Sequence, residues 1–139
     1  MLRTKASQIN GKRNTKTIKE VIHILVVDDL KVNFLLIKAI LGKLNARVIY
    51  ADNGFKAIES IKQTPAIDLI LMDYHMPGMD GMETAKRIKS IMPYLPIISL
   101  STFSPLYENE KVPYDAYLTK PVEPQLLRDT ITQLVNKVL

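Results

Sequence analysis

Five short apolar segments recur along the chain after residue 20 and set its first pattern. They are VIHILVV (21–27), ARVIYA (46–51), DLILM (68–72), PIISL (96–100) and DAYL (115–118). Most of them are continuously apolar rather than alternating, which is typical of strands covered on both faces of a sheet. The pattern therefore predicts five strands, most of them buried on both sides.

Helical periodicity fills the intervals between these segments. Apolar or small residues recur three and four positions apart, and they form four stripes: Val32, Leu35, Leu36, Ala39 and Ile40; Gly54, Ala57, Ile58 and Ile61; Ala85, Ile88 and Met92; and Leu127, Ile131, Leu134 and Val138. Strand and helix thus alternate along the chain. This alternation predicts an α/β fold with a parallel sheet and helices on both faces, and five strands favour the flavodoxin-like doubly wound order 2-1-3-4-5.

The excess of positive charge lies outside this pattern. The 139 residues include 19 Lys and Arg and 14 Asp and Glu, a formal net charge of +5. Residues 1–21 contain six of these basic residues and a single acidic one, so the remainder of the chain is balanced. Because this segment is polar and has no aromatic residue to stack on bases, we interpret residues 1–21 as a basic leader or linker rather than a nucleic-acid-binding arm. Residues 22–139 then form one domain.

Composition also limits the kind of protein. The chain has no cysteine, hence no disulfide, no thiolate zinc site and no thiol nucleophile, which fits a reducing compartment. No apolar run approaches the roughly 18 residues of a membrane span, and the amino terminus lacks the apolar core of a signal peptide. We therefore expect a soluble cytoplasmic protein that binds neither a membrane nor nucleic acid directly.

Polar residues stand where the apolar segments end. Asp28 and Asp29 follow the first segment, Asp73 the third and Ser101 the fourth, while Lys120 lies just beyond the fifth. In an open parallel sheet the carboxyl ends of the strands share one edge, and ligands bind there where the strand order reverses. The predicted fold therefore gathers three carboxylates, a hydroxyl and an ammonium that are far apart in the sequence.

This set of groups favours phosphoryl chemistry with a metal ion. Carboxylates close together raise one another's pKa unless a cation lies among them, and Mg²⁺ is usually held by one or two carboxylates beside a phosphate. Asp28 and Asp29 are therefore candidate metal ligands. A carboxylate can also act as a nucleophile and form an acyl phosphate, with cations around the transferred group. Asp73 is then the candidate phosphoryl acceptor, and Lys120 and Ser101 are the complementary groups.

Four motifs in this order resemble the receiver domain of two-component response regulators, from about residue 22 to residue 139. They are VVDD (26–29), LILMDYHMPGMDG (69–81), PIISLST (96–102) and DAYLTKP (115–121). The resemblance implies that Asp73 is phosphorylated, in a Mg²⁺-dependent reaction, by a histidine kinase or a histidine phosphotransfer protein. The domain would then serve as a signalling switch or a phosphorelay step, catalysing transfer to itself and its own slow dephosphorylation.

The resemblance also implies how the metal is held. Asp28 and Asp29 correspond to the acidic pair of the family, with Asp29 the more direct ligand. Asp73 and the backbone carbonyl of His75 complete the implied ligand set.

Further roles follow from the same motifs. Ser101 corresponds to the hydroxyl residue that closes on the phosphoryl group, and Lys120 to its cationic partner. Tyr117 corresponds to the aromatic switch. Pro121 matches the Lys-Pro turn of the family, which often has a cis bond.

Other interpretations remain open from the residues alone. An Asp-nucleophile phosphohydrolase typically has a second Asp two residues after the nucleophile, where this chain has His75. A receiver-like interaction module that never carries phosphate would not need the whole set of acidic, hydroxyl and amino groups. Asp29 could be no more than a helix cap, and the His75 side chain is expected to be a solvent-facing loop group.

The stretch between Ser101 and Lys120 departs from the family pattern. It is shorter than a typical receiver needs for a full helix, and it contains Pro105 and Pro113, so it predicts a shortened or irregular fourth helix. We expect no output domain after the last helix. The run VDDLKVNFLLIKAIL (27–41), with Asn33 four residues after Asp29, is similar to the same segment of receivers fused behind sensor histidine kinases. The domain is therefore expected to be either the C-terminal part of such a hybrid kinase, on the cytoplasmic side of a membrane, or a free single-domain regulator.

Overall fold

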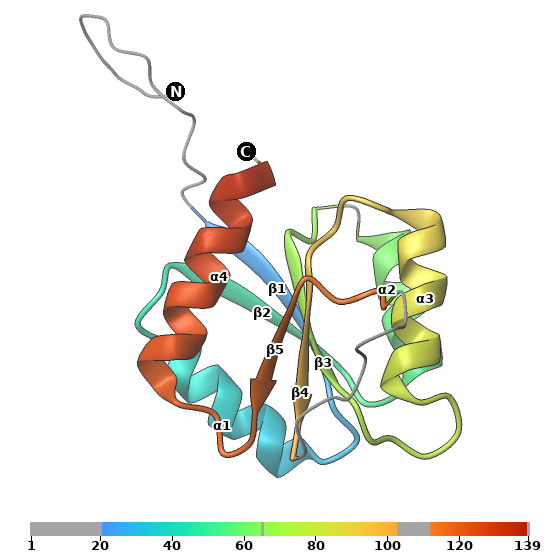
Figure 1. The fold of residues 1–139 in the computed structure, drawn as a ribbon, viewed down its shortest axis with the longest axis horizontal. Helices are drawn as coiled ribbons and strands as arrows, with labels where there is room; N and C mark the ends of the chain where they lie inside the picture. Colours follow the sequence, from blue (N-terminus) through green and yellow to red (C-terminus); the bar gives the residue numbers. More distant parts are fainter. Residues whose placement is uncertain (1–20, 65, 103–111, 139) are drawn as a thin grey trace, which may run out of the picture.

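A computed structural model of the chain describes residues 21–64, 66–102 and 112–138. Five strands lie in one sheet, and all neighbouring strands are parallel (Figure 1). They are β1 (Ile22–Val27), β2 (Ala46–Ala51), β3 (Leu69–Asp73), β4 (Ile97–Ser101) and β5 (Ala116–Thr119). The order β2-β1-β3-β4-β5 confirms the doubly wound fold that the alternation of strand and helix predicts.

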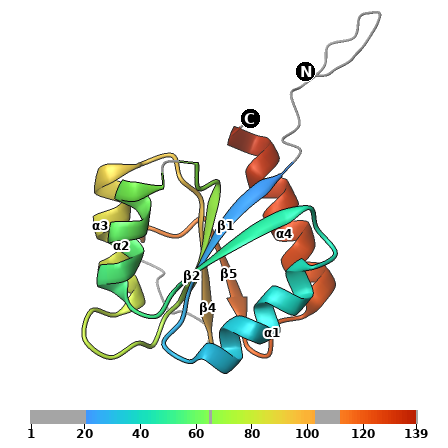
Figure 2. The same cartoon turned by 180° about the vertical axis from the view of Figure 1, so that it is seen from behind.

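Four helices of the described residues cover the two faces of the sheet. They are α1 (Lys31–Leu41), α2 (Gly54–Gln63), α3 (Gly81–Ile91) and α4 (Pro124–Val138). Figures 1 and 2 show α1 and α4 on one face and α2 and α3 on the other. The central strands β1, β3 and β4 therefore run between two layers of helix, which is why their segments are apolar at consecutive positions, whereas the edge strands β2 and β5 are mostly half-buried or exposed.

The strands divide their side chains between two separate cores. In β1, Ile24 and Val26 pack in the core beneath α1 and α4, whereas Leu25 and Val27 pack in the core beneath α2 and α3. This alternation follows from the two-residue repeat of a strand. All four side chains are buried, so a slip of one residue in register would exchange the two cores.

Side-chain caps fix where two of the helices begin. Asn53 accepts a hydrogen bond from the backbone N–H of Lys56 at 2.8 Å and begins α2, and Asp80 accepts one from Glu83 at 2.9 Å and begins α3. Each cap satisfies an N–H group that the first turn of a helix leaves without an intrahelical partner. The loops after β2 and β3 therefore end at defined residues.

The apolar stripe that predicts α1 lies mostly on the exposed face of the helix and not on the face that packs against the sheet. Val32, Leu35 and Leu36 are 61%, 51% and 62% exposed, and the buried residues of α1 are instead Phe34, Ile37 and Leu41. The reason is that α1 is apolar on two sides, so periodicity identifies the helix without saying which side packs on the sheet. This helix leaves an apolar outer face uncovered within the described residues.

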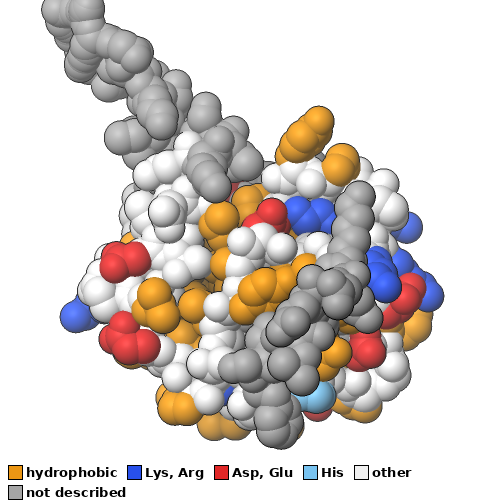
Figure 3. Space-filling model, viewed as in Figure 1, with side chains coloured by type: hydrophobic (Ala, Val, Ile, Leu, Met, Phe, Trp, Pro, Cys, Tyr) orange, Lys and Arg blue, Asp and Glu red, His pale blue; other side chains and the backbone are white. Residues whose placement is uncertain are grey.

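Charged side chains of both signs are mixed over the face of the molecule in Figure 3. This mixture agrees with the balanced count of acidic and basic residues after residue 21. The basic leader and most of the segment expected to form a shortened fourth helix, residues 103–111, lie outside the described residues. No helix among the described residues is both long and apolar enough to cross a membrane.

Candidate functional site

Three carboxylates meet at the carboxyl edge of the sheet. Asp28 follows β1, Asp29 comes next, and Asp73 is the last residue of β3, the central strand. One carboxylate oxygen from each residue lies within 4.8 Å of the others. Asp28 and Asp73 are only 2% and 5% exposed, and Asp29 is half-buried. The strand ends thus bring together the acidic residues that the sequence places there.

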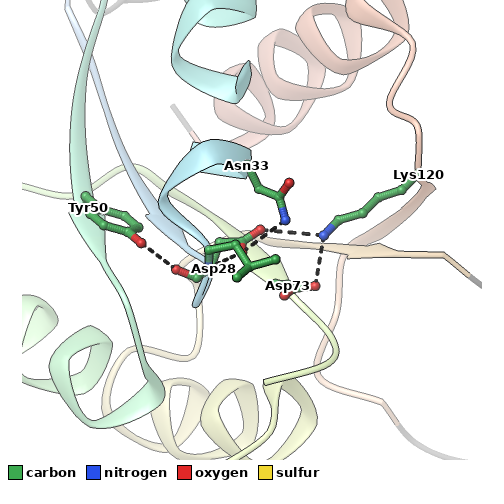
Figure 4. Close-up of polar contacts among 6 residues, drawn as sticks. Asp28, Asn33, Tyr50, Asp73 and Lys120 are labelled. Atoms are coloured by element: carbon green, nitrogen blue, oxygen red, sulfur yellow. Dashed lines mark hydrogen bonds and ion pairs between the residues drawn. The ribbon is translucent and has the colours of Figure 1, made fainter. Parts of the chain in front are cut away.

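Asp28 is held by hydrogen bonds from the start of α1. Its Oδ1 accepts from the backbone N–H of Leu30 at 2.9 Å and from Nδ2 of Asn33 at 3.3 Å (Figure 4). Asp29 does not cap this helix, because the N-cap residue is Leu30 and no side chain makes a cap hydrogen bond there. The helix-cap interpretation of Asp29 is therefore wrong, and its carboxylate is left to the acidic cluster.

Lys120 is the cation that faces this cluster. Its Nζ lies 3.1 Å from Oδ1 of Asp73 and 3.5 Å from Oδ2 of Asp28, so one ammonium bridges two carboxylates. The backbone N–H of Lys120 donates to the carbonyl of Ser101 at 2.8 Å, which fixes the residue to the end of β4. The peptide bond that follows, to Pro121, is cis, as the resemblance implied.

The local environment raises the pKa of Asp73. Burial is the largest cause and the charge of Asp28 the next, while the charge and hydrogen bond of Lys120 act in the opposite direction. Three carboxylates beside one ammonium leave the cluster short of positive charge. A hard divalent cation with oxygen ligands fits this donor set, and Asp28, Asp29 and Asp73 would hold it.

The loop after β3 explains why turn residues follow Asp73. Gly78 has φ 78°, a conformation that favours glycine. Gly81 begins α3 where a Cβ atom would overlap the carbonyl oxygen of Asp73 and meet Cα of Tyr74 at 3.0 Å. The Gly81 N–H also donates to the Tyr74 carbonyl at 3.0 Å. The glycine lets α3 begin directly against the strand end that carries Asp73.

The remaining predicted residues lie at the same edge or beside it. Ser101 ends β4, is buried, and lies one position beyond Leu100, which pairs with Asp73. His75 is exposed, which agrees with a solvent-facing side chain, and its ring meets that of Tyr74 edge to face at 4.8 Å. Tyr117, in β5, is partly exposed, and its ring lies edge to face with Tyr114 at 5.7 Å.

Two residues at the site were not among the predicted site residues. The sequence marks Asn33 only as a family-like feature, yet its side chain contacts the carboxylate of Asp28. The sequence predicts Tyr50 only as part of a strand, yet its hydroxyl donates to the backbone carbonyl of Asp28 at 2.9 Å. A signal for Tyr50 existed, because β2 neighbours β1 in the predicted strand order and Tyr50 lies one residue before the end of its segment.

Comparison with known proteins identifies the family of this arrangement. Residues 24–132 match the family described as the response regulator receiver domain. The chain is 35% identical over 124 residues to the sensor histidine kinase GacS of Pseudomonas protegens, and 36% identical over 116 residues to the autoinducer 1 sensor kinase/phosphatase LuxN of Vibrio campbellii. These matches cover 84% and 82% of the chain but only 13% and 14% of the two relatives.

A solved structure agrees with the sequence comparisons. It is the receiver domain of a sensor histidine kinase from Pseudomonas aeruginosa with a magnesium ion coordinated in its active site cleft. Its TM-score to this chain is 0.73 at 28% identity, and the match covers 82% of this chain and 97% of that one. The similarity thus extends over nearly all of that receiver domain.

Proposed function

This chain belongs to the response regulator receiver domain family, and from that premise we propose that Asp73 accepts a phosphoryl group from a phosphohistidine donor. The transfer would depend on Mg²⁺ and would serve as a signalling switch or a step of a phosphorelay. The observation that carries the proposal is the position of Asp73, whose buried carboxylate lies within reach of two further carboxylates and 3.1 Å from the Lys120 ammonium.

The residues suggest how the transfer proceeds. An Asp73 oxygen would attack phosphorus, the P–N bond to the donor imidazole would break, and the leaving nitrogen would take up a proton. Lys120 is placed to pair with an oxygen of the arriving phosphoryl group, and the Ser101 hydroxyl would donate to another. A Mg²⁺ ion held by Asp28, Asp29, Asp73 and the His75 carbonyl would neutralise phosphoryl charge that the lone ammonium cannot.

The acid cluster favours this function over the alternatives. A phosphohydrolase of the Asp-nucleophile class would need a second acid near the nucleophile to protonate the leaving group, and the side chain two residues on, His75, is exposed. A module that never carries phosphate would gain nothing from burying two carboxylates against each other, because that arrangement is electrostatically unfavourable.

The proposed partner is a histidine kinase or a histidine phosphotransfer protein. Receiver domains of hybrid kinases interact with such proteins, and the curated relatives include hybrid-type sensor kinases several times longer than this chain. The reaction would then take place in the cytoplasm, where a histidine kinase is phosphorylated from ATP. Tyr117 would report the phosphoryl group by changing its position at the exposed edge strand β5.

Phosphorylation by a small donor tests the proposal directly. With Mg²⁺ and acetyl phosphate, intact-mass spectrometry should show one added phosphoryl group that is labile in base, and none in Asp73→Asn. Asp80→Asn is the matched control, since Asp80 is an exposed helix cap, and it should be phosphorylated like the wild type. Addition at another residue, or persistence in Asp73→Asn, would show that Asp73 is not the acceptor.

A further inference from the structure

Tyr50 links the edge strand β2 to the acidic pair. It lies opposite Val26 in the pairing of β2 with β1, so its side chain is on the α1 face of the sheet. From there its hydroxyl reaches past the end of β1 and donates to the carbonyl oxygen of Asp28 at 2.9 Å (Figure 4). The contact is to the backbone of Asp28 and does not involve its carboxylate, which has its own partners in Leu30, Asn33 and Lys120.

Strand β2 holds the backbone of Asp28 on both sides. The Asp28 N–H donates to the carbonyl of Ala51 at 3.1 Å, and the Asp28 carbonyl accepts from Tyr50. Because these two groups belong to the peptide units before and after the Cα atom, both backbone dihedrals of Asp28 are constrained. The second unit also contains the N–H of Asp29, so its orientation fixes the N–Cα bond from which the Asp29 side chain is built.

The ring of Tyr50 is itself fixed. It stacks on Phe34 with ring centroids 4.3 Å apart and an interplanar angle of 21°, and Phe34 is buried on the inner side of α1. Stacked aromatic pairs of this kind contribute beyond the area they bury. The Phe34 ring also lies 6.0 Å from Nζ of Lys38. The hydroxyl is therefore presented to Asp28 from a side chain with little rotational freedom.

We propose that Tyr50 is a positioning residue of the metal and phosphoryl site, which acts by fixing the peptide between Asp28 and Asp29. The inference rests on the proposed function, because the orientation of Asp29 matters only where a cation is bound. The Asp28 carboxylate is held by Leu30 and Asn33, and the Leu30 bond also restrains the peptide after Asp29, whereas the peptide before Asp29 accepts its hydrogen bond from Tyr50. The effect of losing the hydroxyl should therefore fall mainly on Asp29.

Tyr50→Phe isolates the hydroxyl, because it keeps the ring and its stack on Phe34. We expect Mg²⁺ affinity to fall about fivefold, which is the effect of losing one ordinary hydrogen bond that the bound state requires. The backbone amide of Asp29 should also exchange faster or become more mobile in NMR measurements without metal. Without metal, the Tm should fall by no more than about 3 °C, since Tyr50 is half-buried and water can take the place of its hydroxyl as the donor.

Tyr94→Phe is the matched control. Tyr94 is 86% exposed and follows α3, and losing its hydroxyl should change neither Mg²⁺ affinity nor the Asp29 amide. Mg²⁺ titration followed by amide shifts, and calorimetry without metal, give the two readouts for all three proteins.

The outcomes separate this proposal from the one on which it rests. If wild type neither binds Mg²⁺ nor is phosphorylated, the proposed function fails. If wild type does both and Tyr50→Phe binds Mg²⁺ as tightly, the positioning role alone is overturned. A fall in affinity together with a much larger loss of Tm without metal would also overturn it, because the hydroxyl would then be a general structural contact.

Discussion

Asp28 and Asp29 are adjacent and carry the same charge, yet their surroundings give them different tasks. The Asp28 carboxylate is buried and accepts from Leu30 and Asn33 while it faces Lys120, so it is part of the framework of the site. Asp29 is half-buried, does not cap α1, and adds negative charge to a cluster that is already short of cations. Removing either carboxylate should therefore affect the protein in a different way.

Asp29→Ala should weaken Mg²⁺ binding by at least about tenfold and leave the fold intact, because one carboxylate ligand is lost. Without metal its Tm should stay the same or rise, since one of three mutually repelling charges is gone. Calorimetry without metal and Mg²⁺ titration measure the two effects.

Asp28→Ala is the matched comparison for that variant. It should lose about 1–3 kcal/mol of stability even without metal, because it leaves the Leu30 N–H and the Asn33 amide without their acceptor. If Asp29→Ala proved the less stable of the two without metal, Asp29 would be a structural residue.

At the scale of elements, the outer face of α1 is apolar and exposed among the residues that the structure describes. Leu30, Val32, Leu35 and Leu36 expose apolar side chains side by side at the end of the helix nearest the acidic cluster. In the proposed function a phosphohistidine would approach Asp73 from this edge of the sheet, so a donor protein would contact the same end of α1. An apolar helical face suits a helix of the donor as its partner.

Leu36→Asp should slow phosphotransfer from the cognate donor protein at least about tenfold, because it places a charge where an apolar contact of about 1.5–3 kcal/mol would form. Phosphorylation by acetyl phosphate should stay unchanged, because this small donor needs no docking face. Tyr94→Asp, on an exposed residue away from α1, should leave both rates unaltered. Equal loss with both donors would mean that the substitution damages the site rather than the docking face.

The sequence pattern predicts where strands and helices lie better than it predicts which face of a helix is buried. The five strands agree with their predicted segments to within one residue, because short apolar runs that alternate with helical stripes are typical of strands in a sheet with helices on both faces. The sequence predicts the position of helix α1 correctly but predicts the wrong face of it to be buried. Two sets of apolar residues fit the helical repeat, the exposed Val32, Leu35 and Leu36 and the buried Phe34, Ile37 and Leu41.

The site, too, could be predicted only in part from the sequence. Its acidic residues and Lys120 could be predicted, because strand ends fix where such residues meet. The predicted strand order could have placed Tyr50 beside the end of β1, but not its hydrogen bond to Asp28, because that bond depends on the length of one side chain and on a stack with Phe34 in another element. Contacts made by side chains across elements leave no periodic trace in a sequence.

At the scale of the whole molecule, the site costs the fold some stability. Folding moves Asp73 into a buried place beside Asp28, and its pKa rises above the ordinary 3.8. The folded protein therefore holds this proton more tightly than the unfolded chain does. Between pH 3.8 and the raised pKa, unfolding releases a proton, so the free energy of unfolding falls as the pH rises through that window.

Asp73→Asn removes this titration while it keeps an oxygen for the hydrogen bond from Lys120. Without metal, the Tm of this variant should equal that of wild type below about pH 3.8, exceed it increasingly as the pH rises, and level off above the raised pKa. Calorimetric scans from about pH 3.5 to about pH 8 measure the difference. A difference that does not change with pH would mean that burial of the Asp73 charge does not cost stability.

At neutral pH, Mg²⁺ should make the Tm of wild type higher than that of Asp73→Asn. A ligand at about 100 times its Kd stabilises the folded state by about 2.7 kcal/mol, and only wild type retains all three carboxylates. Wild type should therefore gain more in Tm from Mg²⁺ than Asp73→Asn does, and the gain should shrink in acid as protons compete for the same oxygens. Equal gains in the two proteins would place the stabilising ion away from Asp73. The stability that this domain loses by burying its acids would then not be recovered through the metal, and the acidic cluster would need a different explanation.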